Sequence, residues 1–181
     1  MNGIEVSTPD IVLLLFRTTL GVMIIAHGYN HLFGVGGVDG TARWFESLGF
    51  RPARVHALMS GILELAVGVG LILGLLTALA CAGLIGTMAV AGWVAHRPNG
   101  FFIFRDGYEY VLVVAVAALT LAALGPGTVS ADAVLGVVDY GSWQSSGLIG
   151  LVAVIVAGFG GLIGAVVLLG TGWRPARRSD G

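Results

Sequence analysis

Long apolar runs alternate with short polar segments along the chain. A membrane-spanning helix needs about 20 predominantly apolar residues, because each residue advances the helix by about 1.5 Å. Five runs reach or approach that length, and segments rich in glycine, proline and arginine separate them. We therefore predict an all-α membrane protein with five spans: residues 11–29, 53–73, 77–95, 108–124 and 147–173.

The connecting segments carry patterns of their own. Residues 41–48 place Trp44, Phe45 and Leu48 on one side of a short helix, which is typical of a piece lying in the membrane interface. Residues 74–76 are barely a turn, so the second and third spans should form a tight antiparallel hairpin. Residues 130–143 are too polar to span, and we expect a short surface helix there.

Composition supports membrane insertion. Hydrophobic residues make up 56% of the chain and charged residues 10%, against roughly 25% charged residues in a soluble domain. The lipid bilayer is therefore the first partner, and the net charge of -1 gives no reason to expect nucleic acid. The single cysteine, Cys81, lies inside an apolar run, so this chain offers neither an intramolecular disulfide nor a multi-cysteine metal site.

Arginine positions predict the orientation. There is no lysine, and the segment before the first run has no basic region of the kind a cleavable signal peptide carries. With five spans, eight of the nine arginines fall on one side, which predicts an external N-terminus and a cytoplasmic C-terminus. These eight are Arg43, Arg51, Arg54, Arg97, Arg105, Arg174, Arg177 and Arg178.

Two ionisable residues lie inside predicted spans. Arg17 is in the first span and Glu64 in the second, at similar inferred depths, so we expect them to pair. Charges at bilayer depth cost several kcal/mol and face a cavity, the bundle or an opposite charge. Two interpretations stay open: a buried pair that fixes helix register, or a site for a ligand head group or a proton.

A second set of polar side chains falls near the predicted cytoplasmic boundary. His27 and His31 lie one helical turn apart, and His56, His96 and Glu109 begin or end neighbouring spans at that level. Such a layer could ligate a metal or haem, transfer protons, bind a quinone head group, or simply tolerate the boundary between lipid and water. We assign no metal ligands, because the layer contains no contiguous ligand motif.

Residues 96–110 are the densest polar and aromatic stretch. Asn99-Gly100 and Asp106-Gly107 predict turns, so the aromatic side chains between them should fold back against the membrane surface. Phe101 and Tyr108 could then form a wall for a flat hydrophobic ring that enters from the lipid.

The chain resembles the DoxX family of small bacterial membrane proteins over about residues 11–132. The likeness combines an arginine and a His-Gly pair in the first span, a glutamate and a glycine in the second, a Gly-Leu turn, an Asn-Gly-Phe…Tyr-Glu-Tyr segment and a Gly-Pro-Gly end. These features are Arg17, His27, Gly28, Glu64, Gly68, Gly74, Leu75, 99–101, 108–110, 125–127 and Asp132. His31 stands where the family usually has a lysine.

The resemblance implies a four-helix bundle in the bacterial cytoplasmic membrane. Residues 1–132 would form that domain, and residues 133–181 would add a surface segment, a fifth span and a basic tail. Relatives include the small subunit type of thiosulfate:quinone oxidoreductases, and mycobacterial-looking members are linked to a membrane complex that handles thiol and oxidative stress. The glycine-rich fifth span suits contact with another helix, as in a homo-oligomer or a complex with a partner.

We therefore expect a membrane subunit that binds a quinone-like or other lipid-soluble ligand and works with a peripheral or soluble redox partner. The alternative is a non-enzymatic membrane adaptor that binds a partner or cargo. Candidate catalytic residues are His27, Glu64 and Glu109, and candidate ligand-binding residues are Arg17, His31, His96, Asn99, Phe101 and Tyr108.

The orientation can be tested with reporters that are active only in the cytoplasm. Fusions after Gly100 should be active, and fusions after Gly127 should be silent, because the arginine-rich loops are expected inside. Activity from the fusion after Gly127 would contradict the predicted topology.

Overall fold

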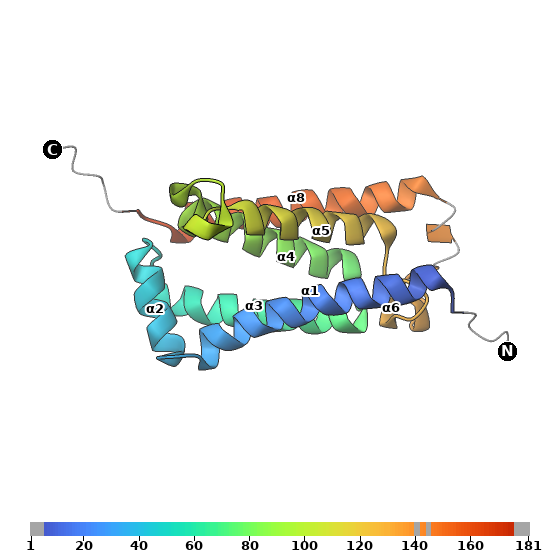
Figure 1. The fold of residues 1–181 in the computed structure, drawn as a ribbon, viewed down its shortest axis with the longest axis horizontal. Coiled ribbons are helices and arrows are strands. Elements are labelled where there is room, and N and C mark those ends of the chain that lie inside the picture. Colours follow the sequence, from blue (N-terminus) through green and yellow to red (C-terminus); the bar gives the residue numbers. More distant parts are fainter. Residues whose placement is uncertain (1–5, 140–141, 144–145, 176–181) are drawn as a thin grey trace.

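The computed structural model describes residues 6–139, 142–143 and 146–175, and their regular elements are helices (Figure 1). The longer helices are α1 (Thr8–Phe33), α2 (Gly37–Ser47), α3 (Ala53–Leu73), α4 (Thr77–Ala91), α5 (Glu109–Leu124) and α8 (Gly147–Gly172). Short helical turns continue α4 over Gly92–His96 and Arg97–Asn99, and others cover Ile103–Arg105 and α6 (Ala131–Val134).

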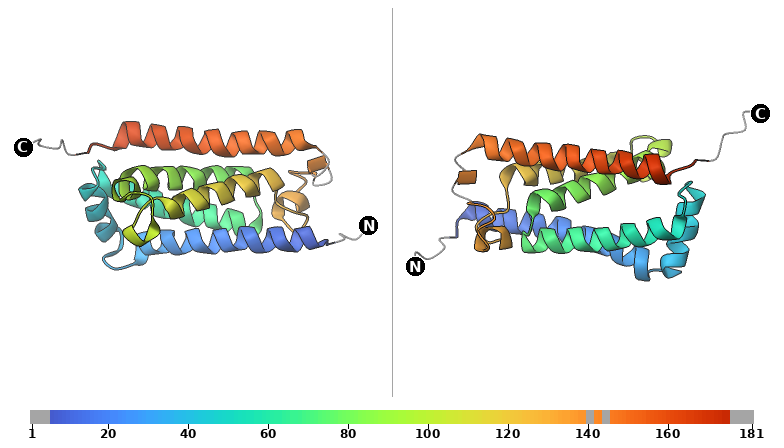
Figure 2. Two further views of the ribbon diagram at one scale, coloured as in Figure 1. Left: turned by 45° about the horizontal axis from the view of Figure 1, so that its top comes forward. Right: turned by 180° about the vertical axis from the view of Figure 1, so that it is seen from behind.

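The long helices run alongside one another, and successive ones point in opposite directions (Figure 1). Helix α1 packs on α3, while α4 packs on α5 and α8. Figure 2 shows α8 along one side of the bundle and α1 along the opposite side. Helix α2 crosses one end of the bundle and contacts both α1 and α3.

Among the residues that the structure describes, four helices are long and apolar enough to cross a membrane: Thr8–Phe33, Ala53–Leu73, Thr77–Asn99 and Gly147–Gly172. The expected fourth span, α5, has 16 residues and a length of about 24 Å, less than the roughly 30 Å of a hydrocarbon core. It ends at Gly125, whose φ of 82° breaks the helix just before Pro126. The described part of the chain therefore contains four candidate spans and one shorter apolar helix.

Helices α1 and α3 approach closely because glycines face each other. A Cβ added to Gly21 would lie 2.7 Å from the carbonyl oxygen of Gly68, and one added to Gly28 would lie 2.8 Å from that of Gly61. Small residues of this kind let helix backbones meet in a membrane, where packing replaces the hydrophobic effect. These two contacts fix the position of α1 along the length of α3.

The small residues of α8 pack against another helix of the same chain. Ala153, Ala157, Gly161 and Ala165 form a buried stripe at intervals of four. A Cβ on Gly161 would lie 2.6 Å from the carbonyl oxygen of Ala82 in α4. Helix α8 therefore contacts α4 of its own chain. The expected contact of this span with a second copy or a partner stays a prediction.

Several arginines lie at one end of the bundle. Figure 1 places α2, the loop between α4 and α5 and the end of α8 at that end. These segments carry Arg43, Arg97, Arg105 and Arg174, while Arg177 and Arg178 of the predicted basic tail lie outside the described residues. We call this the arginine end. There the backbone N–H of Arg174 donates to Gly49 O at 2.7 Å.

The short surface helix expected in residues 130–143 is present, and one of its side chains points inward. A short helix is present at α6, but its Asp132 is buried rather than exposed. The Asp132 carboxylate accepts hydrogen bonds from the backbone N–H groups of Leu76 (2.7 Å) and Thr77 (2.9 Å). Free N–H groups at the start of a helix favour a carboxylate, so the start of α4 draws this segment inward.

The contact between α4 and α8 gives a matched pair of variants. Gly161→Ala should lower the unfolding midpoint in mild detergent, because the new methyl group meets the Ala82 carbonyl and overpacking costs about 1–3 kcal/mol. Gly164→Ala is the control, since an added Cβ there meets nothing within 4 Å. Equal midpoints for the two variants would contradict the proposed packing.

Candidate functional site

Glu64 lies buried between α3 and α1, with 2% of its surface exposed. Its Oε1 accepts a hydrogen bond from the Ser60 hydroxyl at 2.6 Å and lies 3.6 Å from Nε2 of His31. The approach requires glycine on α1, because a Cβ on Gly28 would lie 2.9 Å from the Cβ of Glu64. The structure thus brings together two predicted site residues, one acid and one imidazole.

Helix α2 covers His31. The imidazole stacks on the Trp44 ring with 6.0 Å between centroids and 16° between planes, and meets the Phe45 ring edge-on at 5.6 Å. The Thr41 hydroxyl donates to the backbone carbonyl of His31 at 2.8 Å. The amphipathic segment predicted for the membrane interface therefore also packs against the Glu64–His31 pair and covers its His31 side.

Arg17 lies at the other end of the bundle. Its guanidinium donates to the carbonyl oxygen of Val129 and occupies the space where a Cβ on Gly74 would be. The negative charge of Asp132 stabilises the positive charge of the Arg17 guanidinium. Arg17 is 2% exposed; its hydrogen-bond partner is in the loop after α5, it contacts Gly74 at the end of α3, and its Nε and Nη1 have no hydrogen-bond partner among the described residues.

The expected pairing of Arg17 with Glu64 is wrong. Along the bundle axis, Arg17 lies at the same height as Gly74, the residue that ends α3. Glu64 lies at the height of Gly28 in α1. The predicted pairing requires the start of the first span and the end of the second span to lie at the same depth. In the structure, the first two turns of α1 extend beyond the end of α3, so the two charges lie about ten residues apart along α3.

Three predicted site residues shape the loop between α4 and α5. His96 Nδ1 lies 2.8 Å from the carbonyl oxygen of Asp106, and the Asn99 amide donates to the same oxygen at 3.3 Å. The Glu109 carboxylate accepts from the backbone N–H of Ile103 at 3.0 Å. In the structure, His96, Asn99 and Glu109 therefore hold the loop in its folded form.

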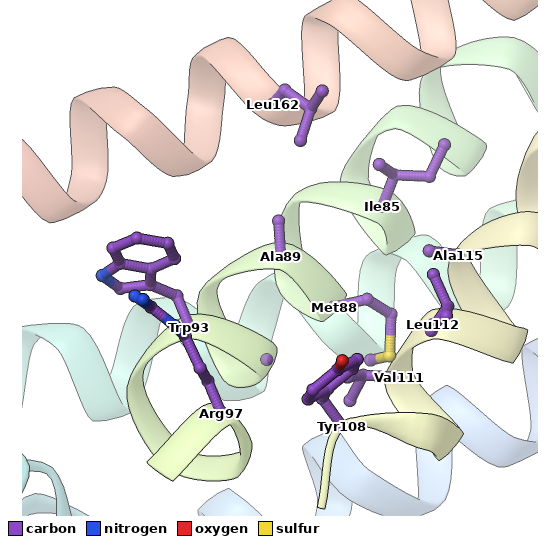
Figure 3. A pocket seen from close by; sticks show the side chains of 11 residues that line it. Ile85, Met88, Ala89, Trp93, Arg97, Tyr108, Val111, Leu112, Ala115 and Leu162 are labelled. Atoms are coloured by element: carbon purple, nitrogen blue, oxygen red, sulfur yellow. The ribbon is translucent and has the colours of Figure 1, made fainter. Parts of the chain in front are cut away.

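A groove of about 360 Å³ runs along the outside of the bundle between α4, α5 and α8 (Figure 3). At its polar mouth, the Arg97 guanidinium lies 4.2 Å from the centre of the Trp93 ring, and Tyr108 begins α5 beside it. Its other walls are mainly apolar: Ile85, Met88, Ala89, Gly92, Val111, Leu112, Ala115 and Leu162.

The remaining candidates do not converge on one point. His27 is exposed on α1, and its ring centroid lies 6.5 Å from that of Tyr110. Phe101 packs edge-on against Tyr108 at 5.4 Å and so borders the groove without lining it. Within the described ranges, no three side chains of His, Cys, Asp or Glu come close enough to hold a metal ion.

Sequence reasoning missed Trp93, Arg97, Ser60 and Asp132 as functional candidates. Ser60 precedes Glu64 by four residues, which is one helical turn, and that spacing could have identified it. Arg97 likewise follows Trp93 by four residues. The burial of Asp132 depends on contacts across more than 50 residues, and no local pattern signals it.

A double-mutant cycle tests the corrected pairing. We expect the stability losses of Arg17→Leu and Glu64→Leu to add within about 0.5 kcal/mol, because the two sites share no partner. Arg17→Leu and Asp132→Asn should instead show a coupling of about 0.5–3 kcal/mol in the same detergent. Coupling confined to the Arg17 and Glu64 pair would restore the original interpretation.

Comparison with known proteins identifies the first half of the fold. Residues 12–97 match the family model described as DoxX, a region that runs from α1 to the arginine beside the groove. The match includes Arg17, His31 and Glu64 and ends before Asn99. Searches of curated proteins and of solved structures found no match. Residues 12–97 of this chain therefore form a DoxX family domain.

Proposed function

We propose that this protein is a five-span membrane subunit that binds a quinone-like ring in the groove between α4, α5 and α8. It would serve an oxidoreductase complex for thiol, sulfur or oxidative-stress chemistry, as in the relatives named above. The observation that carries the proposal is the groove itself: its apolar walls face outward and one polar mouth lies at the arginine end. Its volume falls within the roughly 300–1,000 Å³ typical of ligand sites.

The side chains at the mouth suit a ring that carries carbonyl groups. The Tyr108 hydroxyl and the Arg97 guanidinium both donate hydrogen bonds, and a quinone oxygen accepts them. Trp93 offers an aromatic face for stacking. Because Trp93, Leu112 and Leu162 are 49%, 48% and 51% exposed, a ligand dissolved in the lipid can reach the groove from the side.

The five-span topology requires α5 to cross despite its length. The loop before it presents Phe101, Phe102, Ile103 and Phe104, which are 41–76% exposed. Aromatic side chains favour the membrane interface, so this loop extends the apolar surface of α5 at the arginine end. A bilayer can also thin locally around a short span. The arginine end would then face the bacterial cytoplasm.

The same loop favours a second candidate function, the membrane adaptor. Phe104 is 76% exposed, and Arg105 and Arg97 flank the apolar tip. Exposed apolar residues beside charged ones are common where a partner protein docks. An adaptor would use this tip and leave the groove to ordinary lipid.

Titration of a quinone analogue in nanodiscs distinguishes these functions. Tyr108→Phe and Arg97→Gln should each weaken analogue binding by roughly 2- to 10-fold, because one hydrogen bond contributes about 0.5–1.5 kcal/mol. The unfolding midpoint should change little, since both side chains are at the surface.

Matched controls come from the same chain. Tyr29→Phe removes an exposed hydroxyl from α1, and Arg105→Gln removes an arginine from the same loop outside the groove. Both should keep wild-type affinity. Absence of saturable binding in the wild type, or equal losses in variants and controls, would reject the groove and leave the adaptor.

A further inference from the structure

The Glu64–His31 pair is separate from the groove and needs its own explanation. Glu64 is an acid in a membrane span, and such residues are costly to bury without a function or a partner. One of its oxygens accepts from Ser60, while Oε2 is buried and has no hydrogen-bond partner among the described residues. His31 Nε2, 3.6 Å from Oε1, is its nearest titratable neighbour.

Apart from His27 on α1, whose charge acts on His31, the neighbouring helices α2 and α4 place no charge at the pair. On α2, Asp39 and Glu46 are engaged with Arg54 and Arg51, and Arg43 is exposed. On α4, Thr77–Ala91 contains no charged residue, and its thiol, Cys81, lies in the apolar core. On α1, His27 lies one turn before His31 and is exposed.

We propose that Glu64 and His31 form a proton-binding site inside the bundle. One proton makes the pair neutral as a whole, as the Glu64 carboxylate with the His31 imidazolium, and loss of that proton leaves the buried carboxylate uncompensated. The pair therefore holds the proton tightly and releases it in a single step. This site goes beyond the proposed groove and does not depend on a quinone.

Helix α2 is placed to respond to the proton. The His31 side chain is 16% exposed and that of Glu64 is 3% exposed, so protons reach the pair through the imidazole. The arginine end, where α1, α2 and α3 meet, is the side of access (Figure 1). Because His31 stacks on Trp44, the charge of the imidazole acts directly on the indole ring.

The test uses Trp44 as the reporter, since an adjacent imidazolium quenches indole fluorescence. The protein keeps Trp44 and carries Trp93→Phe, Trp143→Phe and Trp173→Phe, in nanodiscs at a series of pH values. Emission should fall on acidification in one single-proton step. His31→Gln should abolish the step, and Glu64→Gln should move it to lower pH by about one unit or more, because the imidazolium loses its carboxylate.

Two controls separate the pair from general charge effects. His27→Gln removes the neighbouring imidazole, and Glu46→Gln removes an exposed carboxylate of α2; both variants should keep a single-proton step that still responds to Glu64→Gln. If the tryptophan variant is unstable, infrared difference spectra of the otherwise unaltered protein across the step should show imidazolium bands that disappear in His31→Gln. A Trp44 signal independent of pH, a step unmoved by Glu64→Gln, or imidazolium bands retained in His31→Gln would overturn the proposal.

Discussion

A polar group buried in a membrane bundle must find its partner inside the protein, because lipid offers none. Asp132 meets this constraint by accepting from the start of α4, and Asp10 by accepting from the backbone N–H of Thr128 at 2.8 Å. Arg17 meets it only in part: its guanidinium donates to Val129 and lies in the field of Asp132, while Nε and Nη1 have no hydrogen-bond partner among the described residues. These contacts hold the loop after α5 against α1 and α4, and so close the end of the bundle that is opposite the arginine end.

The two ends therefore differ in what they can do. The end with the buried carboxylates is held by hydrogen bonds across long sequence separations, a structural role that leaves few groups for a ligand. The arginine end keeps Arg97 and Tyr108 at the surface beside an apolar groove. Glu64 lies between the ends, on the α1 and α3 side, away from the groove. Ring binding and proton binding would thus occupy separate parts of one bundle.

Hydropathy predicted most of the fold, because each long apolar run has one stable form in lipid, the helix. It overestimated the length of α5, because the apolar run ends at a glycine and a proline before the helix is long enough to cross the membrane. The site was harder to predict. His31 and Glu64 were both identified, but their pairing depends on helix register, which the close contacts of Gly21 and Gly28 determine. The groove needs three helices in place, so of the predicted residues only Tyr108 lines it.

Photo-crosslinking in nanodiscs tests the central claim, that the groove between α4, α5 and α8 is a ligand site, most directly. A photoactivatable quinone analogue should label groove residues such as Met88, Trp93 and Leu112, and excess unlabelled analogue should compete the labelling away. Labelling spread evenly over lipid-facing residues of α1 and α8, without competition, would contradict the account.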